Sequence, residues 1–70
     1  MTESVYKVIE LIGTSKDSWE KAAAAAVGKA GTSLRDLRVA EVVELDLQLD
    51  ASGKIDAYRA KMKVSFKYED

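Results

Sequence analysis

The sequence predicts an α+β fold in which a three-stranded antiparallel sheet partly wraps one helix, in the order β-α-β-β. Three observations predict it: a β-rich stretch near the start, an alanine-rich stretch with helical spacing, and two long alternating stretches that form a hairpin. The chain has 70 residues and no proline-rich linker or internal repeat. Residues 1–70 are therefore expected to form a single domain.

The first strand is predicted over Val5–Ile12. Its β-branched and aromatic residues are interrupted only by Lys7 and Glu10, as expected for a strand with one well-covered face. Gly13–Ser15 follows and is expected to end the strand, because these residue types favour turns.

The helix is predicted over about Ser18–Ala30, with Asp17 or Ser18 as its N-terminal cap and Gly31 as a natural stop. Apolar residues at helical spacing define the face that should pack on the sheet. These residues are Trp19, Ala23, Ala26, Val27 and Ala30, with Leu34 just beyond. Trp19 is accordingly expected to pack in the core and not to stack on a ligand.

The last two strands are predicted over Val39–Leu49 and Ile55–Tyr68, around the loop Asp50–Lys54. Strands usually contain about 3 to 10 residues, and this alternation is longer. The hairpin therefore exposes more apolar surface than one helix can cover, which predicts assembly with further copies of the chain.

The register of the hairpin follows from matching like faces. The predicted pairs are Leu47–Tyr58, Leu45–Ala60 and Val43–Met62 on the apolar face, and Asp46–Arg59 and Glu44–Lys61 on the polar face. Continuing this register would set Glu41 against Val64. A β-bulge at Val42–Val43 is therefore expected, and it would restore the pairs Val42–Val64 and Ala40–Phe66.

Composition excludes several classes of function. Cysteine and histidine are absent, which removes disulfides, thiolate metal sites and the usual general base. No remaining group is arranged as a nucleophile beside its base, so an enzyme is not expected. Eleven basic and twelve acidic residues give a net charge of −1, which argues against nucleic acid or an anionic membrane as partner. No apolar stretch approaches the roughly 20 residues of a membrane span, and a cytoplasmic protein is expected.

Glu44, Asp46, Gln48 and Asp50 alternate along one strand and so share its polar face. They could form a solvated charge ladder with the opposite strand, or part of a calcium shell, which needs about 6 to 8 oxygens. Spacing alone favours the ladder. The loop Asp50–Lys54 with Asp56 is a second oxygen cluster, although its sequence is more typical of a turn.

The chain resembles the dodecin family. The resemblance rests on the element order, on V-Y-K-V-I-E-L-I-G-T-S at Val5–Ser15, on the alanine-rich helix and on K-V-S-F-K at Lys63–Lys67. It covers almost the whole chain. The resemblance implies a homododecamer, a hollow shell of twelve copies that stores flavin and does not catalyse.

The resemblance also implies two flavin-contacting positions. Val39 stands where the family has a stacking tryptophan, and Arg59 stands where it has a glutamine that bonds the ring edge. Valine offers no broad face for stacking, and arginine only donates hydrogen bonds. Flavin binding in the usual mode is not expected. The alternative is a remodelled flavin (FMN or riboflavin) pocket in which Arg59 binds the phosphate of a mononucleotide.

A subset of dodecins that lacks the flavin tryptophan has been described as binding calcium. The chain is similar to that subset in S-W-E-x-A-A-A at Ser18–Ala24 and R-V-A-x-V at Arg38–Val42. The resemblance therefore makes calcium, held at contacts between subunits, the candidate cofactor. Glu44 and Asp46 are the candidate metal ligands, chosen from their chemistry. A purely structural shell without ligand is a further alternative.

Overall fold

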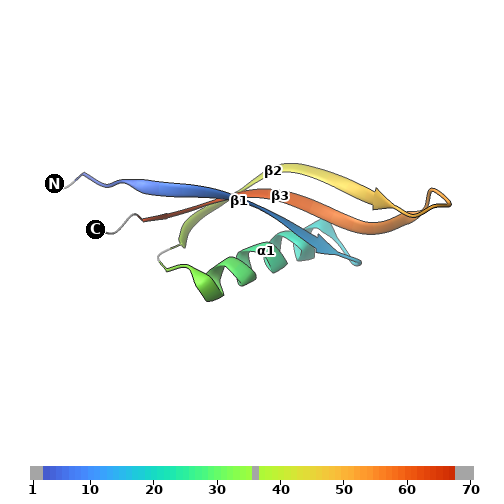
Figure 1. The fold of residues 1–70 in the computed structure, drawn as a ribbon, viewed down its shortest axis with the longest axis horizontal. Coiled ribbons are helices and arrows are strands. Elements are labelled where there is room, and N and C mark those ends of the chain that lie inside the picture. The colour runs from blue at the N-terminus through green and yellow to red at the C-terminus, as the bar shows by residue number, and fades with distance from the viewer. Residues whose placement is uncertain (1–2, 36, 68–70) are drawn as a thin grey trace.

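The computed structural model describes residues 3–35 and 37–67 of the chain. Its elements are β1 (Tyr6–Ser15), α1 (Trp19–Ser33), β2 (Leu37–Leu49) and β3 (Ile55–Lys67). The strands form one antiparallel sheet in the order β1-β3-β2, and α1 lies on one face of it, mainly against β1 and β3 (Figure 1). The predicted α+β class and the β-α-β-β order are confirmed.

Strand β1 continues through Gly13–Ser15, so the predicted end at Ile12 is wrong. These residues pair with β3, with Gly13 opposite Ala60. Gly13 is buried against α1. A Cβ atom at Gly13 would lie 3.0 Å from the Cβ of Ala26 and would overlap the backbone carbonyl of Ala22. Glycine is therefore needed here for close approach of the helix and not for a turn.

Helix α1 begins as predicted and ends later. Ser18 is the N-cap, and its hydroxyl accepts a hydrogen bond from the backbone N–H of Lys21 at 3.1 Å. The predicted end at Ala30 is wrong, because Gly31 keeps a helical backbone and does not adopt the left-handed conformation of a C-terminal cap. The helix closes three residues later, where the N–H of Leu34 donates to the carbonyl of Ala30 at 2.9 Å.

The core is thin and built largely from small side chains. Its central cluster consists of Ala22 and Ala26 of α1 and Ala60, Met62 and Val64 of β3. Ala30 of α1 and Ala57 of β3 are buried outside this cluster. The predicted helical stripe is confirmed for four residues: Ala26 and Ala30 are buried, and Ala23 and Val27 are half-buried against the core. Ala22 is buried in addition. Because alanines separate helix and sheet, the two layers lie close together and bury few large side chains.

Most of β2 remains uncovered. Every residue of β2 after Leu37 is exposed, and on the side facing α1 the exposed fractions of Val42, Leu45 and Leu47 are 48%, 47% and 38%. The hairpin projects beyond α1 (Figure 1), and the radius of gyration is 14.6 Å, against about 11 Å for a compact domain of this length. The predicted excess of apolar surface on the hairpin is confirmed.

The predicted register is confirmed up to the bulge. The confirmed pairs are Leu47–Tyr58, Leu45–Ala60, Asp46–Arg59 and Glu44–Lys61. The bulge at Val42–Val43 is also confirmed, because the register shifts between Val42 and Glu44 and leaves Val43 without a partner.

Beyond the bulge the three predicted pairs, Val43–Met62, Val42–Val64 and Ala40–Phe66, are wrong. The observed pairs are Val42–Met62, Ala40–Val64 and Leu37–Phe66. The predicted register pairs Val43 with Met62, whereas in the structure Val43 is the unpaired residue of the bulge. A second shift of register lies between Leu37 and Val39. Strand β2 also begins two residues before the predicted Val39. The predicted end of the last strand at Tyr68 lies outside the described residues.

Candidate functional site

Three elements meet at Asp46, in the second half of β2. The guanidinium of Arg59 on β3 donates from Nε to Oδ1 at 2.7 Å and from a terminal nitrogen to Oδ2 at 2.9 Å. This bidentate geometry is the strongest form of an arginine–carboxylate pair. The indole Nε1–H of Trp19 on α1 donates to the backbone carbonyl of Asp46 at 3.1 Å. Asp46 therefore ties β2 to both β3 and α1.

Strand alternation places this pair on the outer face of the sheet, which is the face away from α1. Glu44 shares that face with Asp46 and lies opposite Lys61. Of the two predicted charge pairs, Asp46–Arg59 forms an ion pair, whereas Glu44 and Lys61 lie in register and no ion pair joins them among the described residues. Of the predicted charge ladder, only the Asp46–Arg59 ion pair forms.

The charges of the outer face hold Asp46 ionised. The hydrogen bonds from Arg59 lower the pKa of Asp46 below its ordinary value of 3.8, and the charges of Arg59 and Lys61 lower it further. In return, hydrogen bonding to Asp46 raises the pKa of Arg59, with a smaller contribution from the charge of Glu44. Glu44, Asp46 and Arg59 therefore act as one electrostatic cluster.

The donor chemistry of Glu44 and Asp46 fits calcium, which binds oxygen ligands. Two carboxylates do not complete its shell, and residues 3–35 and 37–67 contain no group of three or more acidic side chains placed to hold a metal. Both oxygens of Asp46 also accept hydrogen bonds from Arg59. A calcium ion here would need further oxygens, from water or from a second chain.

The second oxygen cluster of the sequence forms a tight turn. Asp50 Oδ1 accepts hydrogen bonds from the N–H of Ser52 at 2.9 Å, the hydroxyl of Ser52 at 2.7 Å and the N–H of Lys54 at 3.0 Å, and these bonds lower the pKa of Asp50. Gly53 has φ +85°, a conformation that favours glycine. Asp56 instead forms an ion pair with Lys16 at 3.2 Å. Asp50 and Asp56 thus bind different groups, the turn and Lys16 respectively.

The two positions of the flavin site lie far apart within one chain. Val39 is 60% exposed and lies opposite Ser65. Arg59 lies six residues before Ser65 on β3, which corresponds to about 20 Å at roughly 3.4 Å per residue. A pocket that includes both positions would need a second chain, and their role as ligand-binding residues stays a prediction.

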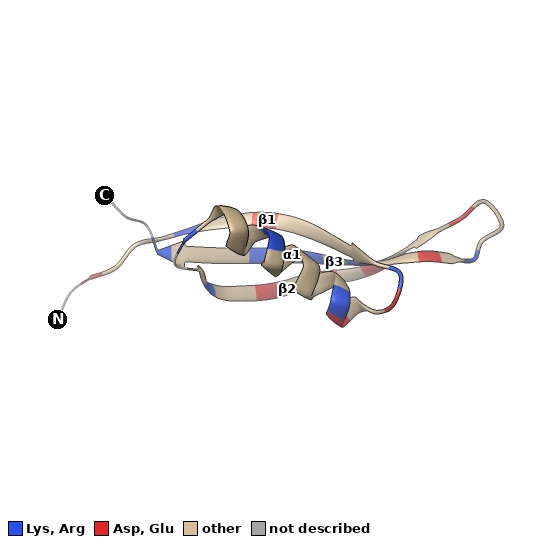
Figure 2. Ribbon diagram, turned by 90° about the horizontal axis from the view of Figure 1, so that it is seen from below, with Lys and Arg blue, Asp and Glu red and all other residues tan. Residues whose placement is uncertain are grey.

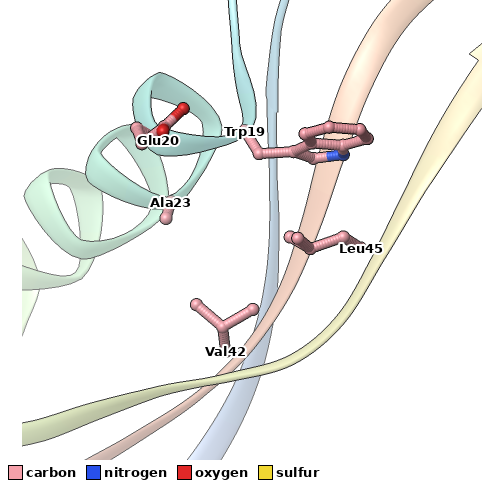
Figure 3. A pocket seen from close by; sticks show the side chains of 5 residues that line it. All are labelled: Trp19, Glu20, Ala23, Val42 and Leu45. Carbon is pink, nitrogen blue, oxygen red and sulfur yellow. The ribbon is translucent and has the colours of Figure 1, made fainter.

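Trp19 lies at the edge of the core. Its ring meets that of Tyr58 edge to face, with the centroids 5.1 Å apart and the planes at 79°. Trp19, Glu20 and Ala23 of α1 and Val42 and Leu45 of β2 line a hollow of about 280 Å³ (Figure 3). Sequence reasoning missed this hollow, because it depends on how the bulged strand β2 passes the helix.

Acidic and basic residues are interspersed along the strands, the helix and the loops (Figure 2). Such mixing is typical of a protein surface that carries no single strong field. Within the described residues, none of the helical structure combines the length and apolar character that crossing a membrane requires.

The fold is that of a small β-α-β-β protein with one helix on a three-stranded sheet. The dodecin family model matches residues 5–69, and the chain belongs to the dodecin family. It is 59% identical over 64 residues to calcium dodecin of Mycobacterium tuberculosis, covering 91% of this chain and 89% of the relative. It is 36% identical over 66 residues to dodecin of Thermus thermophilus, covering 94% of each.

Solved structures agree with this assignment. The structure of dodecin from Streptomyces coelicolor has a TM-score of 0.91 at 31% identity and covers 100% of this chain and 99% of its own. The structure of the M. tuberculosis calcium dodecin, described as a calcium-chelating antigen with a novel calcium-binding site, has a TM-score of 0.84 at 57% identity. The match covers 94% of this chain and 93% of the M. tuberculosis chain. The dodecin fold of the chain is therefore confirmed.

Proposed function

We propose that this chain is a non-catalytic, homododecameric dodecin that binds and stores calcium, with one domain over residues 1–70, in the cytoplasm. The observation that carries the proposal is its 59% identity to a relative named calcium dodecin. The valine at the position of the flavin-stacking tryptophan supports it, because Val39 has no aromatic face to offer a flavin.

Self-assembly is supported by the uncovered side of β2. Val42, Leu45 and Leu47 face α1 without being covered by it, and apolar surface of this kind is buried favourably against another subunit. Nucleic acid and membranes are not proposed as partners, because the charges are balanced and interspersed.

For calcium we propose Glu44 and Asp46 as ligands, completed by water or a neighbouring subunit. The test is calorimetric titration of chelator-stripped protein with calcium. E44Q should weaken binding by about tenfold, because it removes a charged oxygen ligand. The matched control is E41Q, which removes the same charge from the same strand and face, opposite Lys63. Equal calcium affinity of E44Q and the unmodified protein would exclude Glu44 as a ligand.

The alternative is flavin storage in a remodelled pocket. Arginine suits a phosphate group, but Arg59 already bonds Asp46 with two hydrogen bonds, and Val39 lies far from it along the sheet. Titration of FMN and riboflavin with the protein, followed by flavin fluorescence, tests this alternative. Quenching at micromolar protein would support it and count against the calcium proposal.

A further inference from the structure

The carboxylate of Asp46, proposed as a calcium ligand, is already paired with the positively charged side chain of Arg59. Arg59 uses two nitrogens on the two oxygens of Asp46, at 2.7 and 2.9 Å. A calcium ion needs lone pairs of the same carboxylate, and its two charges would be repelled by the adjacent guanidinium. Arginine stays charged throughout the physiological pH range, so deprotonation cannot remove it from the site.

We propose that Arg59 is a built-in competitor of calcium for Asp46, so that calcium binds only when the guanidinium leaves the carboxylate. This inference rests on the proposed calcium function and adds the regulation of that site. Arg59 sets a weaker and more reversible calcium affinity than Glu44 and Asp46 would give on their own.

The Asp46–Arg59 ion pair can open, and Asp46 can then bind another cation, without a change in the fold. The side chains of Arg59 and Asp46 are 39% and 46% exposed, so the guanidinium can swing into water without unfolding the sheet. Asp46 meanwhile stays in place, because its backbone is paired with β3 and its carbonyl accepts the indole N–H of Trp19. Glu44 lies two residues away on the same face, at about 7 Å along the strand, and can share an ion with the released Asp46.

Trp19 supplies a spectroscopic readout. It is the only tryptophan of the chain, and its hydrogen bond ends on the residue whose side chain would exchange partners. Replacement of Arg59 by calcium at Asp46 should therefore change the fluorescence of Trp19 along the same titration curve as the calorimetric heat.

The test compares calcium titrations of the unmodified protein, R59Q and K63Q by calorimetry and by Trp19 fluorescence. R59Q should bind calcium about threefold to tenfold more tightly, because the competing ion pair is gone. K63Q is the matched control. It removes one positive charge from the same strand and the same outer face, but Lys63 lies opposite Glu41 and Glu10, away from Asp46. Its calcium affinity should change by less than about twofold.

The outcomes separate this inference from the proposed function. Tighter binding by R59Q alone supports it. Calcium binding by the unmodified protein with equal or weaker binding by R59Q overturns the inference and leaves the calcium function standing. Equal tightening by R59Q and K63Q overturns it in favour of a general charge effect. If neither the unmodified protein nor R59Q binds calcium, both fail. R59K keeps the charge and loses the bidentate geometry, so it should tighten calcium binding by about twofold. It replaces R59Q in the test if R59Q does not fold.

Discussion

Gly13 shows at the scale of one residue how the helix and sheet are held together. G13A should lower the free energy of unfolding by about 1 to 3 kcal/mol, because the added methyl group overlaps the backbone of α1 and forces the layers apart. Urea denaturation followed by circular dichroism measures the change.

Gly28 gives the matched control for that variant. It lies inside α1 with nothing within 4 Å of an added Cβ atom. G28A should therefore raise the free energy of unfolding by about 0.5 to 1 kcal/mol through helix propensity. Equal effects of the two substitutions would show that α1 does not approach the sheet at Gly13 as described.

The acidic residues Asp46 and Asp50 predict the pH dependence of stability. Hydrogen bonds in the folded state lower the pKa of each below the ordinary value of 3.8. Each group therefore stabilises the fold above about pH 3.8, and this stability is lost as the pH falls through the lowered pKa. Melting temperatures measured between pH 7 and pH 2 should stay level at first and fall below about pH 4.

The variant D50N should lose part of that acid-dependent fall, because asparagine does not titrate. An asparagine can still accept the hydrogen bonds of the turn, so the variant should remain folded at pH 7. A melting temperature that rises on acidification below pH 4 would contradict the assignment.

Among the elements, α1 and β2 are joined at few points, and the hydrogen bond from Trp19 to the carbonyl of Asp46 is one of them. W19F should cost about 0.5 to 1.5 kcal/mol, because it removes this bond and keeps an aromatic ring against Tyr58. Thermal unfolding measures the loss, and W19A should cost more because the ring contact disappears as well. Unchanged stability of W19F would contradict a structural role for the bond.

The elements were largely predictable from the sequence, and the errors have a common cause. Alternation and helical spacing are local properties, so the three strands and the helix could be inferred from them. The bulge at Val42–Val43 could be inferred because the two strands of the hairpin must match their apolar faces. The predictions that Gly13 and Gly31 end their elements are wrong, because a glycine in sequence does not reveal whether its backbone turns or continues the element. For Gly13 that distinction depends on Ala22 and Ala26, which belong to a different element.

The candidate site was predictable only as far as the hairpin register. Register alone placed Arg59 opposite Asp46 and Lys61 opposite Glu44, and the structure confirms both placements. It could not show that only the first becomes an ion pair, nor that Trp19 reaches the carbonyl of Asp46, because both depend on side-chain geometry and on the path of α1 over the sheet.

At the scale of the whole molecule, the uncovered side of β2 predicts that assembly is sensitive to charge there. L45E should dissociate the assembly into smaller species, because burying an unpaired carboxylate at a subunit contact is costly. The isolated chain should tolerate it, since Leu45 is already 47% exposed. Size-exclusion chromatography with light scattering measures the particle mass.

Q48E provides the control for assembly. It adds the same charge to the same strand at a position on the outer face, opposite Ala57, and should leave the particle mass unchanged. Loss of assembly in both variants would mean that added charge anywhere on β2 suffices, and that the side facing α1 has no special role.

Native mass spectrometry of protein purified without chelator tests whether the protein is a calcium-storing dodecamer, because it reports subunit number and bound ligand together. We predict one dominant species with the mass of twelve chains, carrying calcium that a chelator removes and no flavin. A monomer, or a twelve-chain particle that carries flavin and no calcium, would exclude a calcium-storing dodecamer.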